Sequence, residues 1–520
     1  MRQLNRILIV GGGSAGWMTA ALLSKLLKGR YEITLVESEL IGTVGVGEAT
    51  IPAIKKYNEL LGLDEADFML ATQGTYKMGI QFNDWGHLGE SYIHGFGVIG
   101  RELEWLRCHH YWLKMNALGR AGPFENFSIN TAAALQNRFM RPDPRLPESP
   151  LGRIGYAYHF DAGLFARYLR GLAESRGVVR REGRIAGVQL GSDDGFVRSV
   201  TLDDGAVLEA DLFIDCSGFR GLIIEEALKT GYDDWSRWLP CDRAIAMPCE
   251  RTEPLLPYTR ATARDAGWQW RIPLQHRTGN GCVYASAFIG DDEVEATLRA
   301  HLDGAPTGEP NRLRFVTGKR KRVWNRNCVA LGLAAGFMEP LESTSLHLIQ
   351  TGVLRLIRLW PGAGFDPADI AEFNRQTDFE YERIRDFLVL HYKATRRDDT
   401  PFWRHCREMA IPDTLQRKID LWMAHARVVR EDEELFAEES WIQVFLGQGW
   451  TPRGYDPLVD VLDETEIETF VRNVETTILK CVAVMPEHAA FVAKHVKAAP
   501  IEVAPSGPRA AAPVLLRSAG

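Results

Sequence analysis

The sequence predicts an α/β fold in three parts: a parallel βαβ unit at the start, an antiparallel sheet that interrupts it, and a mostly helical C-terminal region. Three observations carry this prediction. A glycine turn joins two β-branched runs, hairpin signals follow near residue 190, and helical periodicity dominates after residue 362.

The N-terminal unit begins with the β-branched run at 5–10, "NRILIV", followed by a glycine turn, a helical stretch at 17–27 and a second run at 31–38 that contains Glu37. This order is typical of a Rossmann-like dinucleotide-binding unit. Glycines allow the backbone to approach a pyrophosphate at a helix N-terminus, and Glu37 can accept a hydrogen bond from a ribose hydroxyl. The turn residues expected to contact the cofactor are Gly11, Gly13, Ser14, Ala15 and Gly16.

The interrupting sheet is predicted from "RIAGVQL" at 184–190 and "FVRSVTL" at 196–202, which are separated by "GSDDG". Before it, Asp161 is placed to cap a helix that ends near Gly177. The chain then returns to the parallel unit at 211–221, "DLFIDCSGFRG". Such an interruption is typical of FAD-binding domains of the aromatic-hydroxylase (GR2) type.

The C-terminal part carries apolar residues at spacings of three and four, as in "DIAEFNRQTDFEYERIRDFLVLHY". We therefore expect an FAD-binding domain with its antiparallel insertion over 1–361, a helical subdomain that completes the substrate site over 362–495, and a disordered Ala/Pro-rich tail over 496–520.

The stretch "TYKMGIQF" at 75–82 alternates like a half-buried strand and places Lys77 with the polar set. By itself such a lysine is a solvated ammonium on an open sheet face. The basic run at 319–322 is likewise interpreted as a solvated strand start.

The segment 327–357 is a third candidate flavin segment, because it reads as a strand, a turn with Gly332, Gly336 and Pro340, and then a helix. Ser343 or Thr344 is the natural N-cap. Glu342 therefore lies beside a helix start whose free amides can hold a small anion, although an acid there is commonly no more than a favourable partner of the helix dipole.

Composition excludes several functions. The net charge of -7 argues against nucleic-acid binding, and no apolar run is long enough for a signal peptide or a membrane span, so we expect a cytoplasmic protein. The eight cysteines lack metal or disulfide spacing, and "RCHHYW" at 107–112 does not surround a metal, so no metal site is predicted.

Six motifs occur in order along residues 5–460: the glycine motif at 11–16, "GVGEATIP" at 45–52, "TYKMGI" at 75–80, "HGFG" at 94–97, "WQWRIP" at 268–273 and "PLEST" at 340–344. Together they resemble the flavin-dependent tryptophan halogenases. The WxWxIP signature is the most specific of the six.

The resemblance implies that reduced FAD, delivered by a separate NAD(P)H-dependent flavin reductase, and oxygen convert a halide (chloride or bromide) to hypohalous acid. That oxidant reaches an aromatic substrate through an internal tunnel. Carried over residue by residue, the match implies Lys77 and Glu342 as catalytic residues, with Ser343 beside them. Lys77 would then point into the tunnel rather than into water. Its ammonium can activate the oxidant by a hydrogen bond, or its neutral amine can form a haloamine, and the sequence leaves both open.

Further roles follow from the same resemblance. Glu48, Ala49 and Thr50 match a segment near the flavin, and the halide is expected at the amides of Thr344 and Ser345. His94, Phe96 and Trp441 match positions that sandwich an indole ring. Trp268 and Trp270 match residues that separate substrate from flavin.

Two departures bear on specificity. The segment before "ESW" has no tyrosine, whereas relatives acting on free tryptophan use tyrosines there to hold the amino acid. Indole or another indole derivative is therefore the expected substrate. Ser345 replaces the usual glycine after "EST", which leaves the halide preference open. The alternatives are an aromatic hydroxylase and a non-catalytic flavin-binding protein, and a homodimer is one expectation for the oligomeric state.

Overall fold

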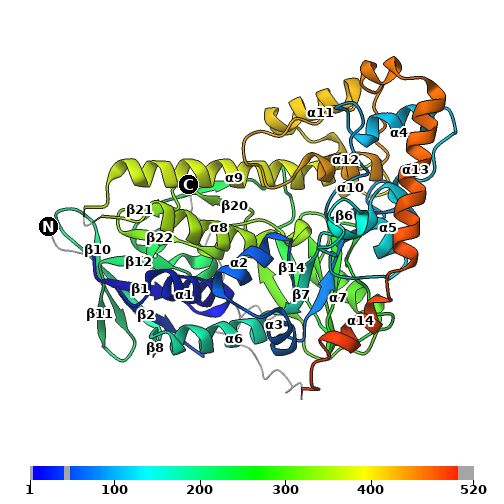
Figure 1. Cartoon of the computed structure of the whole chain (residues 1–520). Helices are drawn as coiled ribbons and strands as arrows, with labels where there is room; N and C mark the ends of the chain where they lie inside the picture. Colours follow the sequence, from blue (N-terminus) through cyan, green and yellow to red (C-terminus); the bar gives the residue numbers. More distant parts are fainter. Residues whose placement is uncertain (1–3, 40–46, 363, 502–520) are drawn as a thin grey trace.

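The structure is a computed structural model that describes residues 4–39, 47–362 and 364–501. A parallel sheet in the order β21-β22-β12-β1-β2-β8 forms one end of the molecule (Figure 1). Only its edge strand β21 is antiparallel. The strands are β21 (Trp324–Asn325), β22 (Cys328–Ala330), β12 (Leu212–Asp215), β1 (Arg6–Val10), β2 (Glu32–Glu37) and β8 (Val179–Glu182).

The predicted βαβ unit is confirmed. Helix α1 (Gly13–Leu27) joins β1 to β2, and both strands run parallel to β12 and β22. The carboxyl ends of β1, β12 and β22 therefore meet at one edge of the sheet, which is where ligands of doubly wound sheets bind. The predicted return of the chain to this sheet occurs at β12.

The predicted hairpins are also confirmed as the antiparallel sheet of β9 (Ile185–Leu190), β10 (Val197–Leu202) and β11 (Val207–Glu209). Beside this predicted insertion, the described residues form an eight-stranded sheet, in which β15 pairs only with β18. Its strands are β19 (Asn311–Arg314), β14 (Arg243–Ala246), β18 (Arg277–Tyr284), β17 (Gly267–Pro273), β16 (Thr259–Arg264), β5 (Gly79–Asn83), β6 (Ser91–Gly95) and β15 (Cys249–Glu250).

Two small sheets complete the strands. One holds β3 (Gly47–Ala49), β7 (Ala157–Asp161) and β4 (Thr75–Lys77), and the other β13 (Tyr232–Asp234), β20 (Gly318–Arg320) and β23 (Gly336–Phe337). The single strand expected over 75–82 is thus split at Met78 into β4 and β5, which belong to different sheets. Lys77 is completely buried, so the solvated position that such a lysine would have by itself does not occur, whereas a position away from water is what the resemblance implies.

The basic run at 319–322 is also only partly solvated. Lys319 and Arg320 are buried in β20, whereas Lys321 and Arg322 are exposed. Lys319 pairs with Asp233 and Asp378, because a buried ammonium needs opposite charge.

Helices cover the sheets and dominate the C-terminal third, as predicted (Figure 1). Asp161 caps α6 through bonds to the amides of Gly163 and Leu164, and Gly177 follows in a left-handed conformation. The helices are α2 (Ala53–Leu61), α3 (Glu65–Ala71), α4 (Cys108–Ala117), α5 (Ile129–Leu135), α6 (Ala162–Ser175), α7 (Asp291–Ala300), α8 (Ser345–Arg358), α9 (Pro367–Lys393), α10 (Pro401–Glu408), α11 (Asp413–His425), α12 (Glu438–Gly447), α13 (Glu464–Ala483) and α14 (His488–His495).

The 27-residue helix α9 runs from the parallel sheet to the eight-stranded sheet (Figure 1). Near its start Asn374 accepts hydrogen bonds from the amides of Val323 and Trp324 at the edge of the parallel sheet. Its last turns carry His391 and Tyr392, which are fully buried beside the eight-stranded sheet. Most of the predicted tail, residues 502–520, and part of the GVGEATIP motif, residues 45–46, lie outside the described residues.

Candidate active site

Lys77 ends β4 and is completely buried, with 0% of its surface exposed. Its Nζ donates a hydrogen bond to Ser343 Oγ at 2.8 Å and lies 5.4 Å from the centroid of the Phe96 ring. Burial lowers the pKa of the Lys77 ammonium to about 7, although the charge of Glu342 opposes the shift. The amine is therefore poised to gain or lose a proton near neutral pH.

Glu342 is also completely buried and ends the short helix η6 (Pro340–Glu342). Nδ1 of His94 lies 3.0 Å from both carboxylate oxygens, and Nε2 of His391 lies 2.9 Å from Oε1. Burial alone would raise the pKa of Glu342, but the charge and hydrogen bonds of the two histidines outweigh it and hold the pKa at about 2. The carboxyl group is thus kept ionised out of contact with water.

Ser343 and Thr344 turn the chain from η6 into α8. Ser343 has φ of +58°, a left-handed conformation that costs a non-glycine residue energy. Thr344 occupies the N-cap position predicted for it or Ser343, but neither hydroxyl caps the helix. The Ser343 hydroxyl accepts from Lys77 instead, and Thr344 Oγ1 is buried without a hydrogen-bond partner among the described residues.

These features fit a halide. The N-terminal amides of α8 have no side-chain cap, a buried hydroxyl is unpartnered, and the helix start favours negative charge. Ser345, whose side chain is partly exposed, is the first residue of the helix.

Glu339 is a buried carboxyl that the sequence analysis did not single out. Its Oε2 accepts hydrogen bonds from Trp268 Nε1 and from the Tyr392 hydroxyl, each at 2.6 Å, while Oε1 has no partner in the part of the chain that the structure describes. Burial raises the pKa of Glu339 to about 7, and these two bonds oppose that shift. The end of α9 therefore contacts the 339–342 segment at two points: Tyr392 contacts Glu339, and His391 contacts Glu342.

The glycine turn after β1 has the shape of a dinucleotide cradle. A Cβ on Gly11 would lie 2.3 Å from the Cys216 carbonyl oxygen, and one on Gly16 would lie 2.0 Å from the Gly11 carbonyl oxygen. The first turn of α1 has no side-chain cap, so its amides can bind a pyrophosphate. The residues present therefore fit FAD. Glu37 ends β2 and accepts from Arg180 Nε at 2.6 Å.

The other predicted cofactor residues fall into two groups. Gly13, Ser14 and Ala15 begin α1, and Gly332 packs against Ala15, since a Cβ on Gly332 would lie 2.7 Å from the Ala15 Cβ. In β3, desolvation raises the pKa of Glu48 to about 7, and Ala49 is buried.

Three further residues have structural contacts of their own. The Thr50 hydroxyl donates to the Tyr158 carbonyl at 2.8 Å, and Gly336 packs against the backbone of Gly318. Pro340 begins η6. Their contact with the cofactor stays a prediction.

Two of the three predicted aromatic residues, His94 and Trp441, contact a ring that the sequence analysis missed, whereas Phe96 lies against Lys77. His94 and Trp441 both meet Phe387 edge-on, with centroids 5.6 and 4.9 Å away. Phe436 stacks on Phe387 at 3.9 Å. Trp441 is 1% exposed, and its Nε1 finds no hydrogen-bond partner within residues 4–39, 47–362 and 364–501.

Trp268 and Trp270 lie on one face of β17, with ring centroids 6.2 Å apart in an edge-on arrangement. Both are buried, at 1% and 7% exposure. Trp268 is held by Glu339, three residues before Glu342. One of the two barrier residues implied by the resemblance, Trp268, is therefore hydrogen-bonded to the segment that carries the predicted catalytic carboxylate.

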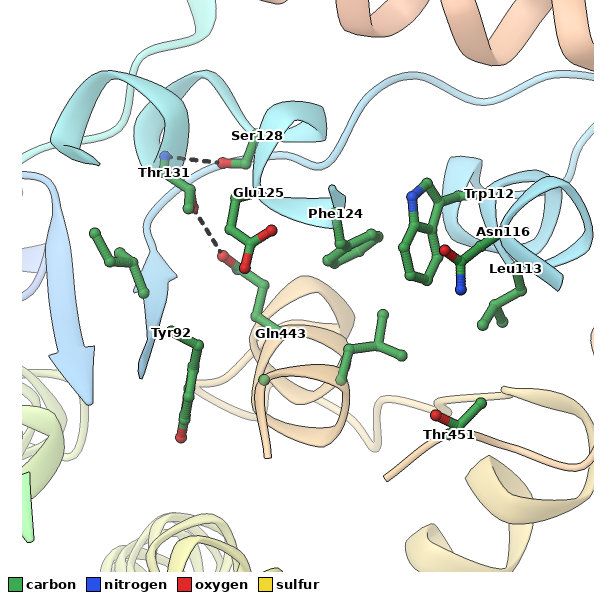
Figure 2. Close-up of a pocket in the computed structure, with 13 residues that line it drawn as sticks. Tyr92, Trp112, Leu113, Asn116, Phe124, Glu125, Ser128, Thr131, Gln443 and Thr451 are labelled. Atoms are coloured by element: carbon green, nitrogen blue, oxygen red, sulfur yellow. Dashed lines mark hydrogen bonds between the residues drawn. The ribbon is translucent and has the colours of Figure 1, made fainter. Parts of the chain in front are cut away.

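A pocket of about 230 Å³ is drawn in Figure 2. It is lined by residues that include Tyr92, Trp112, Phe124 and Gln443. Gln443 accepts from Thr131 and bonds both backbone groups of Gly95. None of the predicted site residues is in its lining, although the lining includes Ile93, the neighbour of His94 in β6.

All eight cysteines are free, and seven are buried. Within residues 4–39, 47–362 and 364–501, no group of three or more His, Cys, Asp or Glu side chains could hold a metal ion, and no helix is long and apolar enough to span a membrane.

The chain is similar to known proteins over most of its length. Residues 6–464 match the family model described as tryptophan halogenase. The tryptophan 7-halogenase RebH of Lentzea aerocolonigenes is 38% identical over 445 residues, covering 81% of this chain and 82% of its own. Two solved flavin-dependent halogenases superimpose closely. The one from Xanthomonas campestris has a TM-score of 0.93 and 47% identity over 96% of this chain and 100% of its own. BrvH from Brevundimonas sp. BAL3 has a TM-score of 0.91 and 48% identity over 94% and 99%.

Proposed function

The chain belongs to the tryptophan halogenase family and is a flavin-dependent halogenase, and from this premise we propose that Lys77, Glu342 and Ser343 transfer the halogen to an indole rather than to free tryptophan. The observation that carries this proposal is the buried contact of Lys77 with Ser343, the neighbour of Glu342, across 266 residues of sequence. A lysine and a carboxylate placed together out of water are costly to maintain, and such costs are typical of functional sites.

When bound, reduced FAD together with oxygen would supply the two-electron oxidation that converts a halide to hypohalous acid. The glycine turn after β1 and the uncapped start of α1 would hold its pyrophosphate, and Glu37 its ribose. Thr344 and Ser345 would hold the halide at the start of α8.

Lys77 then activates the oxidant. With a pKa of about 7, a large fraction of the side chain is ammonium at neutral pH. An ammonium can donate a hydrogen bond to the oxygen of the hypohalous acid and deliver a proton as the oxygen–halogen bond breaks, so that water leaves. Ser343 Oγ, 2.8 Å from Nζ, fixes the direction of the amine.

Glu342 accepts the proton that the ring loses once the carbon–halogen bond has formed. The ring cation that forms when the halogen adds is a very strong acid. A carboxylate with a pKa of about 2 is therefore basic enough to take its proton. The proton then returns to Lys77, and the reaction closes with no net proton gain: aromatic C–H and hypohalous acid give C–halogen and water.

The preference for an indole without a free amino-acid end rests on charge pairing before Trp441. In this segment Lys418 and Glu434 are buried and paired at 2.9 Å. Arg417 pairs with Glu431, and Glu439 pairs with Arg107. These charged side chains pair with one another rather than with the charged groups of a free amino acid. Phe436 presents only an apolar ring to the site.

The test is an incubation of the enzyme with FAD, a flavin reductase, NADH, bromide, and either indole or L-tryptophan. We expect bromoindole by mass spectrometry and much less bromotryptophan. Efficient bromination of free tryptophan would overturn the substrate proposal. The reductase is a separate partner in this proposal, and FADH2 reaches the halogenase by diffusion.

A further inference from the structure

Trp441, one of the residues expected to sandwich the substrate, carries the same ring that the proposed reaction halogenates. Its indole meets Phe387 edge-on, with centroids 4.9 Å apart, and Phe387 meets His94 in the same way at 5.6 Å. His94 in turn lies 3.0 Å from the carboxylate of Glu342. Oxidant delivered to a substrate in this slot is therefore delivered close to an indole that belongs to the protein.

Trp441 is more reactive towards an electrophile than the phenyl rings beside it. Phe387 and Phe436, which stack at 3.9 Å, lack the nitrogen lone pair that makes an indole electron-rich. Trp441 is also only 1% exposed, so oxidant formed inside the protein, rather than oxidant in the solvent, is what this ring meets.

A buried cation lies over the Trp441 ring. Nζ of Lys418, in α11, is 5.1 Å from the ring centroid, within the range of a cation–π contact. Nζ donates hydrogen bonds to the Val429 carbonyl at 2.8 Å and to Glu434 Oε2 at 3.1 Å, and Glu434 Oε1 lies 2.9 Å away. All three oxygens are acceptors, which suits an ammonium group. Lys418 and Glu434 are each 2% exposed, so water screens the charge only weakly.

We propose that Lys418 protects Trp441 from halogenation by the enzyme's own oxidant. In the unwanted reaction a ring carbon attacks the halogen of hypohalous acid, a carbon–halogen bond forms as the oxygen–halogen bond breaks, and the indole becomes positively charged. Loss of the ring proton then gives halotryptophan and water. The ammonium of Lys418 repels the positive charge that builds up on the ring, so the reaction at Trp441 is slower than it would be beside a neutral side chain.

The inference rests on the proposed halogenation of an indole in this slot, and it gives the buried ion pair a purpose. A purely structural role, in which the pair only joins α11 to the segment before α12, is the alternative. Buried ion pairs contribute little to stability compared with apolar residues of similar volume, because desolvation offsets the attraction. We therefore expect Lys418→Met/Glu434→Leu, which replaces both charges, to fold even if Lys418→Met alone does not.

Two further variants separate charge from structure. Lys418→Arg keeps a cation beside the ring. Lys319→Met is the matched control, because Lys319 is 3% exposed and pairs with Asp233 and Asp378, but lies in β20 of a different sheet.

The test follows Trp441 during turnover. The unmodified enzyme and the four variants are incubated with FAD, a flavin reductase, NADH, bromide and indole. Peptide mass spectrometry then measures the bromine or oxygen added to Trp441 per FADH2 oxidised, and the same samples are assayed for bromoindole. Oxygen is counted because water can displace bromide from a brominated indole. Trp105, which is 92% exposed, reports oxidant that leaks into the solvent.

We expect modification of Trp441 to rise at least about tenfold in the two variants that lose the cation, in line with a desolvated cation–π contact. Lys418→Arg and Lys319→Met should match the unmodified enzyme, and modification of Trp105 should not change. Equal modification of Trp441 with and without the cation would overturn the inference while bromoindole still forms. Failure of the proposed halogenation has a different sign, which is the absence of bromoindole from the unmodified enzyme.

Discussion

Lys77 Nζ and Ser343 Oγ lie 2.8 Å apart, although 266 residues separate them in sequence, and both residues are buried. β4 brings the amine, and the turn between η6 and α8 brings the hydroxyl together with Glu342. A short strand and a strained turn thus build the proposed reaction centre.

Two substitutions of Ser343 should have the same effect on activity but different effects on stability. Ser343→Ala and Ser343→Gly both lose the acceptor for Lys77, so we expect both to halogenate about tenfold more slowly, in line with one lost hydrogen bond to a charged group. Glycine also relieves the left-handed backbone at φ +58°. Ser343→Gly should therefore be about 1 kcal/mol more stable than Ser343→Ala in thermal unfolding. Equal stability of the two variants would mean that the turn is not strained.

Glu342→Gln keeps the shape of the side chain and removes its charge. Loss of a general base typically lowers the rate by about 10² to 10⁴. We expect a fall of this size in the halogenation rate measured by single-turnover product formation, with FAD binding unchanged in a fluorescence titration. A rate near that of the unmodified enzyme would remove Glu342 from proton transfer.

Lys77 should also leave a signature in stability against pH. Its pKa of about 7 in the folded protein lies below the ordinary value of 10.5, so the unfolded chain binds more protons between these values. The free energy of unfolding should therefore rise from pH 7 to pH 10.5 by a contribution of up to about 5 kcal/mol. Lys77→Met should remove this contribution, which urea unfolding at several pH values would measure. The same slope in both proteins would show that Lys77 is not buried as a low-pKa amine.

Trp268 should control which product forms. Trp268→Ala opens the barrier between substrate and flavin, so we expect the ratio of halogenated to hydroxylated product to fall. Trp268→Phe keeps a ring there but loses the N–H that Glu339 accepts at 2.6 Å, and it should retain most of the ratio. Mass spectrometry of both products provides the measurement. An unchanged ratio in Trp268→Ala would argue against a barrier role.

Local patterns predicted local structure well. The β1-α1-β2 unit follows from two β-branched runs and a glycine turn, and the cap of α6 from Asp161, because these depend on neighbours in sequence. The parallel pairing of β16 with β5 could not be predicted, since it joins residues near 80 to residues near 260 and no periodicity records such a partner.

The site divides in the same way. Lys77 and Glu342 were found only through the resemblance, since each alone has an ordinary explanation in its strand or helix start. His391 and Tyr392 were missed because "LVLHYK" fits an amphipathic helix, and only the fold reveals that two buried polar groups there face Glu342 and Glu339. The available signal in the sequence was a histidine and a tyrosine in an otherwise apolar stretch of helix, and the sequence analysis did not single them out.

The most direct test of the central claim compares Lys77→Met with the unmodified enzyme in one reaction containing FADH2, oxygen, bromide and indole. Methionine fills a similar volume without an amine. We expect flavin oxidation to continue at the unmodified rate while bromoindole falls below detection, at least about 10³-fold, because the oxidant forms but is not activated. Bromoindole formation at a rate close to that of the unmodified enzyme would contradict the account.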